Sequence, residues 1–226
     1  MENMADLKLI QLNTERLLSE LPEGVTLLAA VKKRTTAEVE AAFQAGIRHF
    51  GHNYVQEAKA MIPDLHFKAN WHLIGHLQRN KARDAAALFD IVESLDSVRL
   101  ANALERQCEL QGKRLSVLIE VNSGREEYKT GVLPEEVDDL AKILSGLKHL
   151  KLVGLMTMGP FTGNPEDARP YFVETRKFFE RLSRADIPNF EMRILSMGMS
   201  NSYRVAIEEG ANLIRIGTEL FGPRER

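Results

Sequence analysis

Two adjacent lysines, Lys32 and Lys33, directly follow a short apolar run, Val25–Val31, near the start of the chain. A primary amine can form a Schiff base with an aldehyde only after losing its proton, which requires burial or nearby positive charge. Side chains alternate along a strand, so one lysine can face a site while the other faces outward. Arg215, in a later apolar run, could supply the charge. The same pattern also fits two solvated charges at a strand end.

Two later segments have the composition of an anion site. Ser196–Ser202 is a turn of small residues, and Gly217 with Thr218 follows the apolar run Leu213–Ile216. Backbone N–H groups and hydroxyls in such turns can bind an anion. The alternative is that Ser200 or Asn201 only caps a helix.

Short β-rich runs alternate with longer helical patterns along the chain, which is typical of a parallel sheet. Eight such runs in 226 residues favour an α/β fold, a single closed (β/α)8 TIM barrel over 1–226 with an extra N-terminal helix over about 4–19. The expected strands are Val25–Val31, Arg48–Phe50, Trp71–Ile74, Ile91–Ser94, Leu115–Val121, Leu152–Met156, Met192–Leu195 and Leu213–Ile216. In such barrels a phosphate site commonly follows strands seven and eight, where both small-residue turns lie.

Composition narrows the range of partners. The formal net charge is −2, so no basic field indicates nucleic-acid binding, and no apolar run is long enough to span a membrane. The one cysteine, Cys108, suits a reducing cytoplasm, and its helical context favours a packing role. His72 and His76 have no acidic or thiol residues gathered near them, so we expect no metal site.

Several motifs in a fixed order resemble the pyridoxal phosphate homeostasis protein family, whose fold is similar to the N-terminal barrel of alanine racemase. The resemblance covers nearly the whole chain, from about Leu27 to Gly222. The residues that carry it are Ala30–Lys33, Phe50–Glu57, Trp71–Lys81, Asn122, Lys129–Gly131, Gly154–Met158, Leu195–Ser200, Arg215–Thr218 and Phe221–Gly222.

The resemblance implies that the cofactor is pyridoxal 5′-phosphate and that Lys33 carries it as a Schiff base. The other cofactor residues that it implies are Asn53 beside the ring, Arg215 at the pyridine nitrogen, and Ser200, Gly217 and Thr218 at the phosphate. An arginine cannot accept the pyridinium proton, so the ring becomes a weaker electron sink than it would be beside a carboxylate. This choice disfavours transaminase-like chemistry.

The sequence departs from the family pattern at three positions. Lys32 stands where a small residue, often serine, precedes the reactive lysine, His52 stands where glutamate is common, and Ser202 stands where aspartate is usual. None of these changes removes the lysine, the arginine or the phosphate turns. Lys129, in a loop after the fifth strand, is expected to be a surface charge rather than a second reactive amine.

The resemblance implies a carrier that takes part in intracellular vitamin B6 homeostasis, with no catalytic residues and with pyridoxal phosphate-dependent apoenzymes as recipients. The alternatives are an amino acid racemase and a Schiff-base aldolase. Racemisation needs acid–base groups on both faces of the substrate carbon. In alanine racemase the second group is a tyrosine from a C-terminal β domain, which we expect to be absent here. That absence also favours a monomer, and we expect the carrier to be cytoplasmic.

Overall fold

The computed structural model describes residues 4–160, 163–185 and 187–223. Eight parallel strands form a closed barrel in chain order, and β1 pairs with β8 to complete the ring. The strands are β1 Thr26–Ala30, β2 His49–His52, β3 Asn70–Leu73, β4 Ile91–Leu95, β5 Leu115–Val121, β6 Leu150–Thr157, β7 Phe190–Ser196 and β8 Leu213–Ile216. The expected (β/α)8 fold is confirmed, and the strand ends differ from the expected ones by at most two residues.

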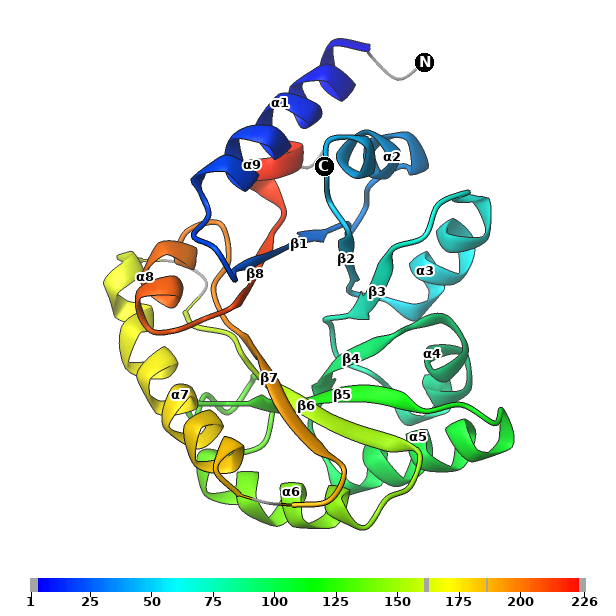
Figure 1. Ribbon diagram of the computed structural model, residues 1–226, viewed down its shortest axis with the longest axis vertical. Coiled ribbons are helices and arrows are strands. Elements are labelled where there is room, and N and C mark those ends of the chain that lie inside the picture. Colours follow the sequence, from blue (N-terminus) through cyan, green and yellow to red (C-terminus); the bar gives the residue numbers. More distant parts are fainter. Residues whose placement is uncertain (1–3, 161–162, 186, 224–226) are drawn as a thin grey trace.

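Helices surround the barrel on its outer side (Figure 1). The α-helices are α1 Met4–Glu20, α2 Thr36–Gln44, α3 Val55–Met61, α4 Ala82–Leu88, α5 Val98–Leu110, α6 Val137–Ser145, α7 Arg169–Ser183, α8 Tyr203–Glu208 and α9 Thr218–Phe221. The short 3-10 helices are η1 Ile62–Asp64, η2 Arg79–Lys81, η3 Pro134–Glu136 and η4 Pro165–Ala168. Among the described helices, none has both the length and the apolar character needed to cross a membrane.

The expected N-terminal helix is present as α1, and it lies beside the short α9 that follows the last strand (Figure 1). The side-chain amide of Asn13 donates a hydrogen bond of 3.1 Å to the backbone oxygen of Leu220. Arg16 forms an ion pair with Glu219 at 3.3 Å. These contacts fix the first helix against the segment that closes the barrel.

Side chains of the strands divide into two apolar clusters. The inner cluster draws on seven of the eight strands or the residues just after them, so it fills the barrel interior; it contains Leu28, Ile74, Ile91, Leu118, Val153, Met156, Ile194 and Leu213. The outer cluster packs the strands against the helices and includes Leu27, Ala29 and Val31. Because side chains alternate along a strand, Leu28 and Ala30 of β1 face the interior.

Candidate cofactor site

A cavity of about 420 Å³ lies at the mouth of the barrel, where the strands end and the loops to the helices begin. We call it the mouth cavity. It is lined by Ala30, Lys32, Asn53, Ile74, Lys129, Met158, Gly159, Met199, Ser200, Asn201, Arg215, Gly217 and Thr218. The structure therefore brings together five of the six residues predicted to bind the cofactor.

Lys32 lines the mouth cavity and Lys33 does not. Leu28 and Ala30 face the barrel interior, and the same alternation directs Lys32 toward the mouth. Lys33 has a left-handed backbone with a φ of 58°, is exposed, and lines a separate cavity with Glu57. The prediction that Lys33 lies with the other five residues is wrong, because it took the outer face of β1 as the inner one.

The amine of Lys32 is held near an aromatic ring. Its Nζ atom lies 5.0 Å from the centre of the Tyr54 ring, a distance at which a π face attracts a cation. Within the residues that the structure describes, no carboxylate forms an ion pair with Lys32. A primary amine at the mouth is therefore available to a ligand in the cavity.

Arg215 lines the same cavity from β8, the strand that pairs with β1, and is only 4% exposed. Its Nη1 atom donates to the hydroxyl of Ser196, and its Nη2 atom donates to the backbone oxygen of Thr157 at 2.8 Å. Nη1 also lies 3.9 Å from the carboxylate of Glu93. Burial by itself raises the pKa of Glu93, but the hydrogen bond from His72 and the charge of Arg215 bring it below its usual value. The guanidinium is therefore fixed by a charged partner inside the barrel.

The turn after β7 supplies the hydroxyl side of the cavity. Gly198 has a φ of 90°, and a Cβ atom there would lie 2.8 Å from the Cα of Tyr203, so only glycine fits without displacing α8. Ser202, at the position where the family usually has aspartate, accepts the N–H of Met199 at 3.3 Å. The turn presents Ser200 to the cavity, which Gly217 and Thr218 at the start of α9 also line.

Glu120 of β5 is an acidic residue inside the barrel that the sequence did not single out. It is 2% exposed, its Oε1 accepts the hydroxyl of Thr130 at 2.7 Å, and its Oε2 has no partner within the described chain. Burial raises the pKa of Glu120 to about 7. This carboxyl is therefore partly protonated at neutral pH, and small changes in pH around 7 alter its charge.

His52 lies away from the mouth cavity, on the outer face of β2. Its ring packs 5.7 Å from that of Trp71 and 6.3 Å from that of Phe89, measured between ring centres. Both ring nitrogens are buried without a partner in the described chain, and burial lowers the pKa of His52 to about 4. This departure from the family pattern thus changes packing, not the lining of the cavity.

Two expectations about other polar residues need correction. Lys129 is not a free surface charge, since it lines the mouth cavity and donates to Glu126 and to the backbone oxygen of Gly159. His72 and His76 do have acidic partners, Glu93 and Asp96 respectively, because neighbouring strands bring these together. Even so, the described residues contain no cluster of three or more potential metal ligands.

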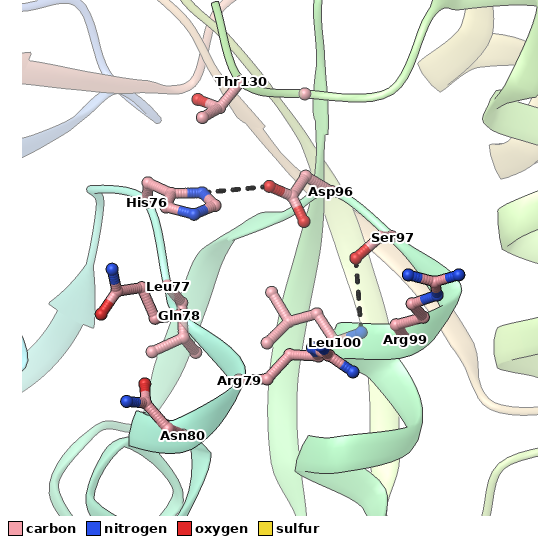
Figure 2. A pocket seen from close by; sticks show the side chains of 11 residues that line it. His76, Leu77, Gln78, Arg79, Asn80, Asp96, Ser97, Arg99, Leu100 and Thr130 are labelled. Carbon is pink, nitrogen blue, oxygen red and sulfur yellow. Dashed lines mark hydrogen bonds and ion pairs between the residues drawn. The ribbon is translucent and has the colours of Figure 1, made fainter.

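A second cavity of about 590 Å³ lies beside the mouth, between the loops that follow β3, β4 and β5 (Figure 2). His76 pairs there with Asp96 at 3.2 Å, and the Ser97 hydroxyl accepts the N–H of Leu100 at the start of α5 (Figure 2). The lining of this larger cavity contains none of the predicted cofactor residues. The mouth cavity is therefore the candidate site.

The chain is similar to known proteins over most of its length. Residues 5–225 match the model of the alanine racemase N-terminal domain family. The chain is 40% identical over 202 residues to the pyridoxal phosphate homeostasis protein of Aquifex aeolicus, covering 88% of this chain and 87% of that protein. The chain belongs to the pyridoxal phosphate homeostasis protein family.

Solved structures of related proteins are similar to this chain in fold. PipY of Synechococcus elongatus, in a structure with PLP bound, is 35% identical with a TM-score of 0.86, covering 94% of this chain and all of that one. Alanine racemase of Clostridium difficile has a TM-score of 0.78 at 14% identity, covering 99% of this chain and 58% of the racemase. At that identity the racemase shares only the fold.

Proposed function

We propose that this chain binds pyridoxal 5′-phosphate in the mouth cavity and serves as a carrier in the homeostasis of that cofactor. The observation that carries the proposal is the presence of an amine, Lys32, a guanidinium, Arg215, and two hydroxyls, Ser200 and Thr218, in one cavity of about 420 Å³. The relatives' names and the structure of PipY with PLP bound support the same ligand.

The donor set fits each part of the cofactor. The hydroxyls of Ser200 and Thr218, with the backbone at Gly217, are donors suited to a phosphate at the ends of β7 and β8. Arg215 is suited to a ring nitrogen that stays unprotonated, since an arginine donates hydrogen bonds and accepts none. Asn53 completes the lining after β2.

Lys32 is the amine that we propose for covalent attachment of the cofactor. When bound, the cofactor supplies an aldehyde, and an amine within the same cavity can react with it once deprotonated. Lys32 is supported by its place in the lining and by the inward alternation of Leu28 and Ala30, whereas Lys33 is exposed and lines another cavity. Arg215 contributes positive charge to the same lining.

Two features of the lining support a carrier over a racemase. Among the described residues that line the mouth cavity there is no tyrosine, histidine or carboxylate to act as a second acid–base group. The amine of Lys129 is engaged in contacts with Glu126 and with the backbone oxygen of Gly159. We therefore propose that the chain has no amino acid racemase turnover and that apoenzymes dependent on this cofactor receive it.

Borohydride reduction of the protein with pyridoxal phosphate tests the attachment. We expect an absorption band in the visible range, loss of that band on reduction, and the added mass on the peptide that contains Lys32. Lys33→Ala is the matched control, one position away, and should keep the band. A Lys32→Ala protein that remains equally yellow and is still modified would defeat the assignment.

Racemase assays test the other half of the proposal. The wild-type protein loaded with the cofactor should leave L-alanine and other common amino acids unchanged in chirality over hours. Sustained turnover that disappears in Lys32→Ala would establish a catalyst in place of a carrier. Transfer to an apoenzyme is measured separately, as recovery of that enzyme's activity on mixing with loaded carrier.

A further inference from the structure

Five polar side chains form a continuous hydrogen-bonded chain through the barrel interior. Each comes from a different strand, and they are Arg215 of β8, Ser196 of β7, Glu93 of β4, His72 of β3 and His49 of β2. The first four are buried, with exposed fractions of 0 to 4%. We call this set the interior chain. It runs from Arg215, which lines the mouth cavity, to His49, which begins β2 at the other end of the barrel.

The contacts are short and none is interrupted. Ser196 Oγ lies 2.6 Å from Glu93 Oε2, and Glu93 Oε1 lies 2.6 Å from His72 Nδ1. His72 Nε2 lies 2.9 Å from His49 Nδ1. Both oxygens of the Glu93 carboxylate are therefore engaged, one from the side of Arg215 and one from the side of the histidines.

The chemistry of these groups fixes where the hydrogens lie. Arginine only donates and a carboxylate only accepts, so Ser196 accepts from Arg215 and donates to Glu93. With both imidazole rings neutral, His72 donates from Nδ1 to Glu93 and accepts at Nε2 from Nδ1 of His49. Burial lowers the pKa of His49 to about 4, in agreement with that neutral form. Every link then contains one hydrogen, and the one negative charge at Glu93 balances Arg215.

We propose that Glu93 is a positioning residue for the cofactor, acting through Ser196 and Arg215, with His72 and His49 holding its carboxylate in place. The inference rests on the proposed function of the mouth cavity. Two of the five N–H groups of Arg215 are used in contacts with Ser196 and Thr157, which fixes the plane of the guanidinium and leaves the other donors for a ligand.

The other charged groups near Arg215 offset its positive charge less than Glu93 does. Glu120 of β5 also acts on the charge of Arg215, but burial raises the pKa of that carboxyl to about 7, so it is only partly ionised near neutral pH. Asp96 and His76, from the loops after β4 and β3, pair with each other at 3.2 Å. Glu93 is therefore the anion that offsets Arg215 through the neutral pH range.

A double-mutant cycle with pyridoxal phosphate as the probe separates positioning from general support of the fold. Dissociation constants are measured by spectral titration for wild type, Glu93→Gln, Arg215→Met and the double variant. We expect Glu93→Gln to weaken binding on the order of tenfold and to move the absorption maximum of the bound cofactor, as loss of a charge-assisted contact implies. In the Arg215→Met background the same change should alter the dissociation constant by less than about twofold. Equal losses in both backgrounds would mean that Glu93 acts on the fold alone and would overturn the proposal.

Glu105→Gln is the matched control. Glu105 also pairs with a histidine, His149, at 2.9 Å, but it does so outside the barrel interior on α5. This control should lose stability and keep its affinity for the cofactor. If Glu93→Gln does not fold, Ser196→Ala tests the proposal instead, because it removes the hydrogen bonds that join Arg215 to Glu93 and keeps both charges. This variant should bind pyridoxal phosphate more weakly than wild type, and the same change should have no effect in the Arg215→Met background.

The outcomes distinguish this inference from the proposed function. If the wild-type protein does not bind pyridoxal phosphate, the proposed function fails and this inference fails with it. If the wild type binds and is modified at Lys32, while folded Glu93→Gln and Ser196→Ala bind within about twofold of it, only the positioning role is overturned.

Discussion

The Nδ1 atom of His72 lies 2.6 Å from the Oε1 atom of Glu93, and neither side chain is exposed to solvent. This contact joins β3 to β4 inside the barrel. Removing only one of the two partners is expected to be costly, because it leaves the other buried with an unmet hydrogen bond or charge.

His72→Phe is expected to destabilise the protein strongly. The substitution leaves the Glu93 carboxylate without the donor on its Oε1, and breaking a buried pair from one side costs about 3–5 kcal/mol. Urea unfolding at pH 7 measures the free energy of unfolding. The control is His66→Phe at an exposed position, which should change that free energy by less than about 0.5 kcal/mol. A His72→Phe protein within about 1 kcal/mol of wild type would show that the pair contributes little.

His52→Phe should make the protein more resistant to acid. Burial holds the pKa of His52 near 4 in the folded state, against 6.5 for a solvated imidazole. The unfolded chain therefore binds the proton first as the pH falls, and wild-type stability declines from about pH 6.5 to about pH 4, by up to roughly 3 kcal/mol. Phenylalanine removes this decline and also the buried unpaired ring nitrogens.

Urea unfolding of both proteins at pH 7, 5.5 and 4.5 checks this prediction. We expect His52→Phe to be more stable than wild type by about 1 kcal/mol at pH 7, from loss of an unsatisfied buried donor. The difference should widen at each lower pH. Parallel curves for the two proteins would show that another group causes the acid sensitivity.

The reversal of the two lysines shows what the sequence pattern can and cannot determine. Alternation correctly places Lys32 and Lys33 on opposite sides of the chain, but both faces of a barrel strand are apolar. Leu28 and Ala30 face the interior while Leu27 and Val31 face the helices, and nothing in their hydrophobicity distinguishes these two sets. The positive φ of Lys33 is likewise a property of the folded loop.

The other part of the site was predictable for a different reason. The small-residue turns around Ser200 and Gly217 follow the last two strands, and the (β/α)8 order alone brings those strand ends together. The interior chain was not predicted, because Glu93 and His49 lie in short strands whose other residues are mainly apolar. The alternation of side chains did carry a signal that both residues face the interior. Glu93 is two positions after the inward-facing Ile91, and Arg215 is two positions after the inward-facing Leu213.

Glu120→Gln is expected to stabilise the protein at mildly alkaline pH. Burial raises the folded-state pKa of Glu120 from 4.5 to about 7, so the folded state keeps a proton that the unfolded chain releases. The stability linked to this proton is fully present below about pH 4.5 and is lost as the pH rises through about 7. The sign is opposite to that of His52.

The stability difference between Glu120→Gln and wild type should therefore grow in favour of the variant from pH 5 to pH 8, by up to roughly 3 kcal/mol. Thermal and urea unfolding at four pH values in this interval measure it. Thr130→Val, which removes the hydroxyl that donates to Glu120, should shift the wild-type transition to higher pH. A difference that is constant with pH would mean that Glu120 is ionised in the folded protein throughout.

Gly75→Ala links the packing of the barrel to the candidate site. A Cβ atom at Gly75 would lie 2.3 Å from the backbone oxygen of Asn53 and 2.9 Å from its Cα, so the backbone of Asn53 must move. Overpacking of this kind costs about 1–3 kcal/mol. Because Asn53 lines the mouth cavity, we expect pyridoxal phosphate to bind about tenfold more weakly.

Gly146→Ala is the comparison for this last substitution, because a Cβ there meets only the backbone oxygen of Ile143, at an ordinary 3.6 Å. Its backbone is right-handed, with a φ of −85°, so alanine fits and should leave both stability and affinity within about 0.5 kcal/mol of wild type. Spectral titration and thermal unfolding of the two variants measure both quantities. If Gly75→Ala lost stability but bound the cofactor as wild type does, Asn53 would have no part in holding the ligand. The expectation that Asn53 lies beside the cofactor ring would then have to be abandoned.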